Sequence, residues 1–197
     1  MLDLKNVTLF GLDNVHPALL NKAAGVCLTY AEFGDLLLLT EETNINSVKD
    51  YSKFMIKELH KYIHTDYVLV IQYDGFILNP ESWTNDFFNY DYIGAPWVSK
   101  QFANPIGNGG FSLRSKKLLE EVSQLKGNYH PEDLSICNLN YDILLDKGFK
   151  FAPYEVGAKF SFESNYERGS MWNNQFGFHD LRITNISNWN DKTRFGY

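Results

Sequence analysis

The first 75 residues alternate between short apolar runs and amphipathic stretches, and this alternation limits the possible folds of the chain. Apolar runs at 7–12, 35–40 and 67–72 predict strands, although the four leucines of the second run leave a helix possible. Apolar residues at helical spacing predict helices over 16–30 and 50–63. Strands that alternate with helices in this way form a parallel sheet with crossover helices. The sequence therefore predicts an α/β fold.

Size and composition fit one globular domain. The chain has 197 residues, of which 44% are hydrophobic, and this is enough for a full-sized core. The net charge of -6 argues against binding to nucleic acid or to an anionic membrane, because either partner requires a basic face. Cys27 and Cys137 lie in apolar patterns and lack the spacing of a disulfide framework or a metal site. No run of 18 apolar residues and no signal-peptide pattern is present, so we expect a soluble, cytoplasmic protein without a transmembrane segment.

The pattern changes after residue 75. Short strands and helices are expected there, with a loop rich in Asn, Gly and Pro between the strands. The expected strands cover 90–97 and 109–113, and the expected helices cover 115–125 and 131–147. Ser115 has the residue type of a helix N-cap, and Gly127 and Gly148 follow the two helices. From residue 149 onward we expect short extended pieces.

Asp74 follows the most strand-like run of the chain, at its carboxyl end. Ligands of open α/β sheets bind beyond these strand ends, and a carboxylate there can hold a metal ion or a polar substrate. Asp-Gly is also a common turn pair, so the alternative is that Asp74 caps the turn before Gly75. This segment alone leaves both interpretations open.

Three further clusters follow Asp74 in the chain. A glycine-rich segment covers 107–113, Glu132 and Asp133 open an expected helix, and His179 lies within 176–180. With Asp74, they resemble the nucleotide-sugar glycosyltransferases of the GT-A fold. That group has an Asp-any-Asp motif after a central strand, a glycine-rich loop, a Glu-Asp pair and a metal-binding His near the carboxyl terminus. Together, the segments 72–76, 92–97, 107–115, 131–133 and 176–180 also resemble a family of glycosyltransferase-like domains.

The resemblance implies one domain over 1–197 with a GT-A-like, Rossmann-related fold, in which a mixed, mainly parallel sheet is flanked by helices. Residues 1–75 would form the nucleotide-binding half and 76–197 the acceptor and catalytic half. The implied activity is transfer of a sugar from a nucleotide-sugar donor, such as a UDP-sugar, to a hydroxyl of a glycan or other acceptor.

The resemblance also implies a metal site at Asp74 and His179. A divalent cation stabilises the negative charge that develops on a departing diphosphate. A carboxylate, an imidazole and phosphate oxygens suit Mn²⁺ or Mg²⁺. The chain departs from the motif at Gln72, which replaces the first acid. The metal would then bind weakly or be dispensable, and Gln72 would instead hydrogen-bond the ribose or the sugar, or close the strand.

By the same resemblance, Asp133, beside Glu132, is the catalytic base. It would take the proton from the acceptor hydroxyl while that oxygen attacks the sugar, which inverts the anomeric centre. A helix N-terminus keeps such a carboxylate ionised. The alternative is that Pro-Glu-Asp merely starts a helix, since these residue types favour that position.

The remaining predicted contacts are with donor, acceptor and partners. Glycines allow backbone amides to approach a bulky ligand, although an ordinary turn is the alternative. The donor and acceptor loop is Gly107, Asn108, Gly109 and Gly110, and the donor-binding residues are Leu9, Gly11, Asp13, Lys53, Lys57, Gln72 and Tyr73.

The aromatic residues are the candidates for contacts with the acceptor and with partners. Acceptor stacking is expected of Trp97 and Trp172, with Trp83 and Tyr166 as further candidates. Of the other histidines, His130 is the one expected near the site. An exposed aromatic patch for a partner domain or a second copy would comprise Trp172, Phe176, Trp189 and Phe195.

Two alternatives to transfer remain open. The first is a catalytically inactive nucleotide- or sugar-binding domain of the same fold, which the missing acid at Gln72 favours. The second is a nucleotidyltransferase, which would be expected to have a basic glycine-rich loop after the first strand. The segment 11–13 does not supply such a loop.

Overall fold

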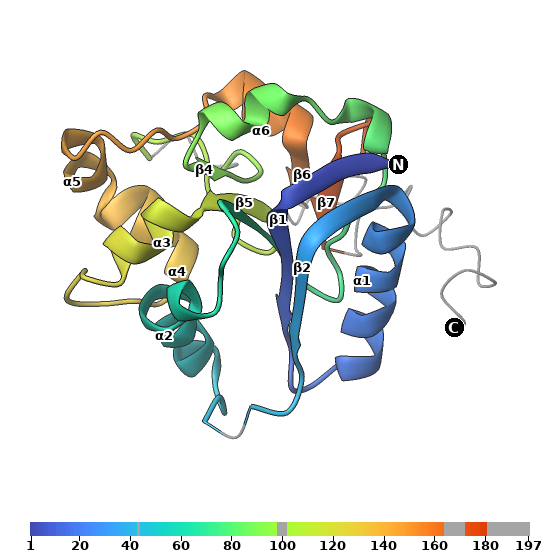
Figure 1. The fold of residues 1–197 in the computed structure, drawn as a ribbon. Helices are drawn as coiled ribbons and strands as arrows, with labels where there is room; N and C mark the ends of the chain where they lie inside the picture. The colour runs from blue at the N-terminus through green and yellow to red at the C-terminus, as the bar shows by residue number, and fades with distance from the viewer. Residues whose placement is uncertain (43, 98–101, 164–171, 181–197) are drawn as a thin grey trace.

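A five-stranded mixed sheet forms the centre of the molecule (Figure 1). The computed structural model describes residues 1–42, 44–97, 102–163 and 172–180. The strand order is β2-β1-β3-β5-β4. The strands are β1 (Leu2–Leu12), β2 (Ala31–Leu39), β3 (Tyr67–Ile71), β4 (Tyr92–Ile93) and β5 (Ser112–Ser115). The first three in sequence are parallel, and β5 pairs antiparallel with both β3 and β4. This is the mixed, mainly parallel sheet that the resemblance to GT-A-fold glycosyltransferases implies.

Helices cover both faces of the sheet (Figure 1). The α-helices are α1 (Pro17–Tyr30), α2 (Val48–Lys57), α3 (Lys116–Val122), α4 (Glu132–Leu134), α5 (Tyr141–Asp146) and α6 (Tyr154–Phe160). Figure 1 shows α1 on one side of the sheet and α2 and α3 on the other. A separate two-stranded parallel sheet joins β6 (Ser161–Glu163) to β7 (Gly177–His179).

Strand β3 is buried on both faces, as its continuous apolar run predicts. Leu69 and Ile71 belong to the core cluster that contains residues of α1, whereas Val68 and Val70 belong to the cluster that contains residues of α2 and α3. Successive side chains of a strand point to opposite faces, so one short run serves both cores. Because β3 is the middle strand of the sheet, its carboxyl end lies between the ends of the neighbouring strands β1 and β5.

The elements of the first half match their predictions more closely than those of the second half. The leucine-rich second run is strand β2 rather than a helix, because it hydrogen-bonds in parallel to β1. The helix predicted over 50–63 ends at Lys57 and is followed by a 3₁₀ turn, Leu59–Lys61.

The single helix predicted over 131–147 is wrong. It is divided into α4, a π-helical turn (Ser135–Leu139) and α5. The backbone N–H and the side chain of Asn140 both donate to the carbonyl oxygen of Ser135. This local bonding competes with the regular helical pattern. Helix α6 was not expected in a tail predicted to be extended.

The aromatic patch predicted for a partner is wrong at Phe176, which is fully buried. Its ring packs against Trp83, Phe111 and Phe160 at centroid distances of 5.0–5.8 Å. Trp172 is half-buried. The other predicted aromatics, Tyr166, Trp189 and Phe195, lie outside the described residues.

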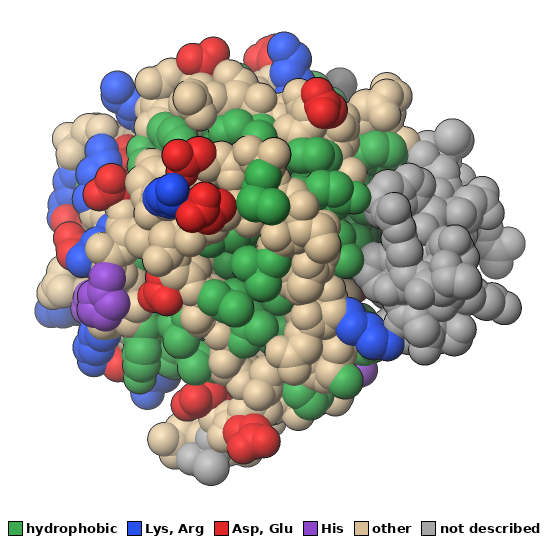
Figure 2. Space-filling view, turned by 45° about the vertical axis from the view of Figure 1, so that its right-hand side comes forward, with side chains coloured by type: hydrophobic (Ala, Val, Ile, Leu, Met, Phe, Trp, Pro, Cys, Tyr) green, Lys and Arg blue, Asp and Glu red, His purple; other side chains and the backbone are tan. Residues whose placement is uncertain are grey.

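The described surface carries charges of both signs. On the face shown in Figure 2, acidic and basic side chains are interspersed around a central hydrophobic area. Cys27 and Cys137 are free and buried, as expected. Among the described residues, every helix is too short or too polar to span a bilayer.

Candidate active site

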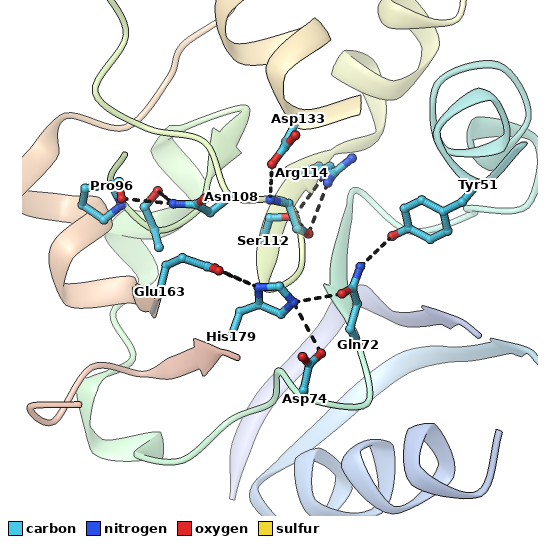
Figure 3. Close-up of polar contacts among 12 residues, drawn as sticks. Tyr51, Gln72, Asp74, Pro96, Asn108, Ser112, Arg114, Asp133, Glu163 and His179 are labelled. Atoms are coloured by element: carbon cyan, nitrogen blue, oxygen red, sulfur yellow. Dashed lines mark hydrogen bonds and ion pairs between the residues drawn. The ribbon is translucent and has the colours of Figure 1, made fainter. Parts of the chain in front are cut away.

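Polar side chains from distant parts of the chain meet beyond the carboxyl end of β3 (Figure 3). Gln72 and Asp74 follow β3 directly, and His179 ends β7. The glycine-rich segment before β5 and the first residues of α4 reach the same edge, since β5 runs antiparallel to β3. Four predicted site segments are therefore brought together.

Asp74 lies in a tight turn but does not cap it. The turn is closed by backbone hydrogen bonds between Gln72 and Gly75, at 3.1 and 3.3 Å. Within the described residues, Oδ1 of Asp74 is buried and accepts no hydrogen bond, and it lies 3.4 Å from Nε2 of His179. A buried carboxylate oxygen without a hydrogen bond is unfavourable unless it meets a cation. This geometry argues against the turn-cap alternative and leaves Oδ1 of Asp74 facing the ring of His179.

His179 lies at the centre of the cluster. Its Nε2 atom is 2.9 Å from Oε1 of Gln72, and its Nδ1 atom lies 2.8 and 3.0 Å from the two carboxylate oxygens of Glu163. Burial alone would lower the pKa of His179, but the neighbouring carboxylates of Asp74 and Glu163 raise that pKa well above its usual value. The ring therefore has acceptor oxygens beside both of its nitrogens.

Tyr51 orients the side chain of Gln72. The Tyr51 hydroxyl oxygen lies 3.4 Å from Nε2 of Gln72, which is a donor. The amide oxygen of Gln72 then faces His179, as Figure 3 shows. Gln72 thus presents an acceptor atom at the position where the related motif has an acid.

The residues that converge here fit a divalent cation. Oε1 of Gln72 and Oδ1 of Asp74 both lie within 3.4 Å of Nε2 of His179. Within the described ranges, no group of three or more His, Cys, Asp or Glu side chains is arranged to hold a metal. The amide oxygen of Gln72 would therefore be the third protein donor. Two oxygens and one imidazole nitrogen suit Mn²⁺ or Mg²⁺.

Two glycines of the predicted loop pack directly on the charged side chains. A Cβ atom at Gly110 would lie 2.3 Å from Nε2 of His179, and one at Gly109 would lie 2.3 Å from Oε1 of Glu132. Real Cβ atoms do not approach other atoms so closely, so both positions require glycine in this arrangement. The loop separates the His179 cluster from the Glu132 and Asp133 carboxylates.

The adjacent acids Glu132 and Asp133 have different surroundings. Oε1 of Glu132 is buried and lies 2.7 Å from Nη2 of Arg114, a fully buried guanidinium that also donates to Gly109 and Ser112. Glu132, which was predicted to be catalytic together with Asp133, is thus engaged in an ion pair.

Asp133 is half-buried, and its two carboxylate oxygens accept the backbone N–H groups of Leu134 (2.7 Å) and Gly109 (3.1 Å). Burial, and secondly the neighbouring Glu132, raise the pKa of Asp133 to about 6. The protonation of Asp133 therefore changes close to neutral pH.

A pocket of about 590 Å³ opens beside Gln72, at the carboxyl end of β1. Its lining includes three of the seven predicted donor-binding residues, Asp13, Gln72 and Tyr73. The rest of the lining is Leu12, Asn14, Val15, Ile45, Asn46, Ser47, Val48 and Tyr51. None of these described lining residues is Lys or Arg.

The other four predicted donor-binding residues do not line this pocket. Leu9 is fully buried in the core, and a Cβ atom at Gly11 would meet the Leu20 side chain of α1 at 2.6 Å. Lys57 donates to the carbonyl oxygens of Ser123 (2.6 Å) and Leu125, just beyond α3. Lys53 is exposed on α2 and is not among the lining residues.

The first two residues of the predicted loop, Gly107 and Asn108, contact the segment 95–97. Asn108, in a left-handed conformation with φ 52°, donates from its side chain to the carbonyl oxygens of Ala95 and Pro96. The ring of Trp97 packs on Gly107, where a Cβ atom would lie 1.7 Å from the ring. Trp97 is therefore held against the loop itself.

The remaining aromatic and histidine candidates are spread over the molecule. Trp172 donates to the carbonyl oxygen of Gln175. Trp83 lines a separate pocket with Met1 and Leu2, at the amino end of β1, far from the strand end that carries the site. His130 pairs with Ser52 of α2 at 2.9 Å.

Tyr51, Arg114 and Glu163 are the residues of this cluster that sequence reasoning missed. Glu163 lies opposite His179 in the β6–β7 pairing. These strands have three residues each, so no periodic pattern reveals them. In the sequence, Arg114 is a single charged residue beside a short apolar stretch, and the sequence pattern gives no sign that its side chain is buried.

Comparisons with known proteins agree with this architecture. A family model described as "Protein of unknown function (DUF5672)" matches residues 36–179. No curated protein matches the chain in sequence at a significant level. The solved structure of a glycosyltransferase involved in glycosylation of the major capsid of PBCV-1 is similar to this chain, with a TM-score of 0.55 and 13% identity, over 96% of this chain and 97% of that one.

A second similar structure is that of the galactosyltransferase LgtC in complex with donor and acceptor sugar analogs. Its TM-score is 0.51 and its identity is 13%, over 89% of this chain and 87% of that one. At this identity the likeness concerns the fold, and the fold shared with both proteins is the GT-A-like α/β fold.

Proposed function

This chain belongs to the DUF5672 family, and we propose that it is a glycosyltransferase that moves a sugar from a nucleotide-sugar donor to an acceptor hydroxyl. One observation carries the proposal: Gln72 lines the 590 Å³ pocket and also contacts His179 beside Asp74. A nucleotide in the pocket would thus extend its diphosphate toward these side chains. Ligands of α/β sheets bind in this position, beyond the strand ends.

The proposed site requires a positive charge for the diphosphate. The described lining residues include no Lys or Arg, and the buried Arg114 is paired with Glu132. We propose that Asp74, His179 and Gln72 hold Mn²⁺ or Mg²⁺. When bound, the cation would stabilise the negative charge of the departing diphosphate.

Asp133 is the proposed base. The acceptor hydroxyl oxygen would form a bond to the anomeric carbon, the bond from that carbon to the diphosphate oxygen would break, and the hydroxyl proton would pass to Asp133. Attack on the face opposite the leaving group inverts the anomeric centre. A base with a pKa of about 6 is ionised at neutral pH and still accepts a proton as the new bond forms.

Binding of UDP in the presence of Mn²⁺, measured by titration calorimetry, tests the nucleotide site, and other nucleoside diphosphates serve as comparison ligands. We expect saturable binding that weakens when Mn²⁺ is removed. Failure of every nucleotide to bind at any Mn²⁺ concentration would contradict the proposal. The Asp133→Asn variant should keep donor binding and lose most transfer to an acceptor, so retained turnover would exclude Asp133 as the base.

A second candidate function is nucleotide or sugar binding without catalysis. Gln72 favours it, because the site has one carboxylate fewer than the Asp-any-Asp motif and His179 already lies between Asp74 and Glu163. Release of free sugar from a nucleotide-sugar in the presence of Mn²⁺ distinguishes the two functions. A binding protein would hold the donor and release none.

A further inference from the structure

Glu163 holds His179 from the side opposite Gln72 and Asp74 (Figure 3). Both carboxylate oxygens lie within 3.0 Å of Nδ1, and the Glu163 side chain is only 16% exposed. An ionised carboxylate only accepts hydrogen bonds, so Nδ1 of His179 carries the donated proton. The contact therefore restricts rotation of the ring and directs Nε2 toward Gln72 and Asp74.

Backbone hydrogen bonds hold the segment around this contact. Glu163 and His179 are partners in the register of the parallel strands β6 and β7. The next residue, Asp180, donates its backbone N–H to the carbonyl oxygen of Asp74 at 2.8 Å. This bond ties the end of β7 to the turn after β3, so the ring has a fixed position between Glu163 and the turn.

We infer that Glu163 is a positioning residue, which acts through His179 and sets the affinity of the Gln72–Asp74–His179 site for a divalent cation. The inference rests on the proposed function, in which that cation meets the diphosphate. A histidine ligand commonly donates its second N–H to a carboxylate, and loss of that partner lowers metal affinity by about 10–100-fold. Glu163 does not itself reach the converging atoms, because the His179 ring lies between.

A purely structural role is the competing explanation. In that case the Glu163–His179 pair would only stabilise the small β6–β7 sheet. Removing Glu163 would then lower thermal stability and leave the orientation of the His179 ring and the cation affinity unchanged. The two explanations therefore differ in a measurement on the folded protein.

The experiment compares Glu163→Ala, Glu163→Gln and Glu155→Ala with the wild-type chain. Glu155 is an exposed carboxylate on the neighbouring α6 and serves as the matched control. Mn²⁺ affinity is measured by titration calorimetry with UDP present. Nitrogen NMR of the imidazole at one fixed pH, without metal, reports the state of His179, whose signals are identified by their loss in His179→Gln.

We expect Glu163→Ala to weaken Mn²⁺ binding at least 10-fold and to shift the Nδ1 signal of His179. Glu163→Gln should stay within about 3-fold of wild type, because its amide oxygen still accepts from Nδ1. Glu155→Ala should match the wild type. Unchanged affinity and an unchanged His179 signal in Glu163→Ala would overturn the inference, as would equal losses in the Gln and Ala variants.

The same data separate this inference from the proposed function. If the wild-type chain binds no Mn²⁺ even with UDP, the proposed metal site fails. The metal-free NMR comparison still decides whether Glu163 orients His179. If the wild type binds Mn²⁺ and Glu163→Ala binds it equally well, the positioning role fails and the proposed function stands.

Discussion

At the scale of single residues, the surroundings of a side chain decide its role more than its identity does. Glu132 and Asp133 are adjacent acids at the start of α4. One is bound by the buried guanidinium of Arg114, and the other accepts two backbone N–H groups and has a raised pKa. The two adjacent carboxylates thus have different hydrogen-bonding partners.

Replacing Asp133 by Asn should change the pH dependence of stability. The folded pKa of Asp133, about 6, lies above the ordinary value of 3.8. Its ionisation therefore opposes folding, and wild-type stability falls as the pH rises through about 6. Asn does not ionise. We expect the free energy of unfolding of Asp133→Asn, relative to wild type, to increase by up to about 3 kcal/mol between pH 4 and pH 8.

Urea denaturation of both proteins at several pH values measures this difference. The comparison removes every group that titrates equally in the two chains. A difference that stays constant from pH 4 to pH 8 would contradict a raised pKa at Asp133. A difference that falls with pH would mean that the carboxylate is stabilised in the folded chain.

Gly110 should not tolerate a side chain. In Gly110→Ala the new Cβ atom would lie 2.3 Å from Nε2 of His179, so either the ring or the loop must shift, and we expect the ring to lose its place beside Gln72 and Asp74. We expect at least a 10-fold loss of Mn²⁺ affinity in the presence of UDP, measured by calorimetry. Gly25→Ala, on the exposed face of α1 with nothing within 4 Å of the new Cβ atom, is the matched control.

The control has its own expected result. Alanine favours a helix over glycine by up to about 1 kcal/mol, so Gly25→Ala should be slightly stabilised and bind Mn²⁺ normally. Normal Mn²⁺ binding by Gly110→Ala would show that His179 is not confined by the loop.

At the scale of elements, Lys57 connects two helices. It lies at the last position of α2 and donates to carbonyl oxygens just beyond α3, while its ammonium lies 5.0 Å from the ring centroid of Tyr129. Cations stabilise the carboxyl ends of helices in this way. The residue predicted to contact phosphate is therefore occupied in packing α2 against α3.

Lys57→Met should lower stability without weakening nucleotide binding. The variant loses two charge-assisted hydrogen bonds, and we expect a loss of about 1–3 kcal/mol in the free energy of unfolding. Lys53→Met, four residues earlier on the exposed face of α2, should unfold like the wild type. Urea denaturation measures the stability, and UDP titration measures the affinity. Weaker UDP binding by Lys57→Met at unchanged stability would restore the phosphate role.

At the scale of the whole molecule, the two predicted halves share one sheet. Strand β3 is the last strand of the first half. It pairs with β1 of the same half on one side and with β5 of the other half on the other side. The larger core cluster likewise combines residues of both halves, such as Leu20 and Ile71 with Phe111 and Phe176. The halves are therefore regions of one folding unit.

An isolated fragment of residues 1–75 should not fold. It would leave one edge of the buried strand β3 without its partner and would expose much of the shared core. We expect no cooperative thermal transition of the fragment by circular dichroism, whereas the full chain should unfold cooperatively. A cooperative transition in the fragment would show that the first half is a domain of its own.

The sequence was most informative where local patterns are long. The strands β1, β2 and β3 contain continuous apolar runs, and α1 and α2 have apolar residues at helical spacing, so strand and helix could be recognised there. The second half has strands of two to four residues and a helix divided by a π turn. Such short elements depend on tertiary contacts, which leave no periodic signal.

The sequence by itself determined the α/β class, the order of the polar clusters and the candidate residues Asp74, Asp133 and His179, because these follow from chain-local patterns and a motif resemblance. The tertiary structure decided which side chains surround them. It buries Arg114 against Glu132, orients Gln72 through Tyr51 and places Glu163 on Nδ1 of His179. These contacts join Tyr51 to Gln72, which are 21 positions apart in the chain, and Glu163 to His179, which are 16 positions apart. Burial and pairing over such separations arise when strands and helices pack, so no local pattern encodes them.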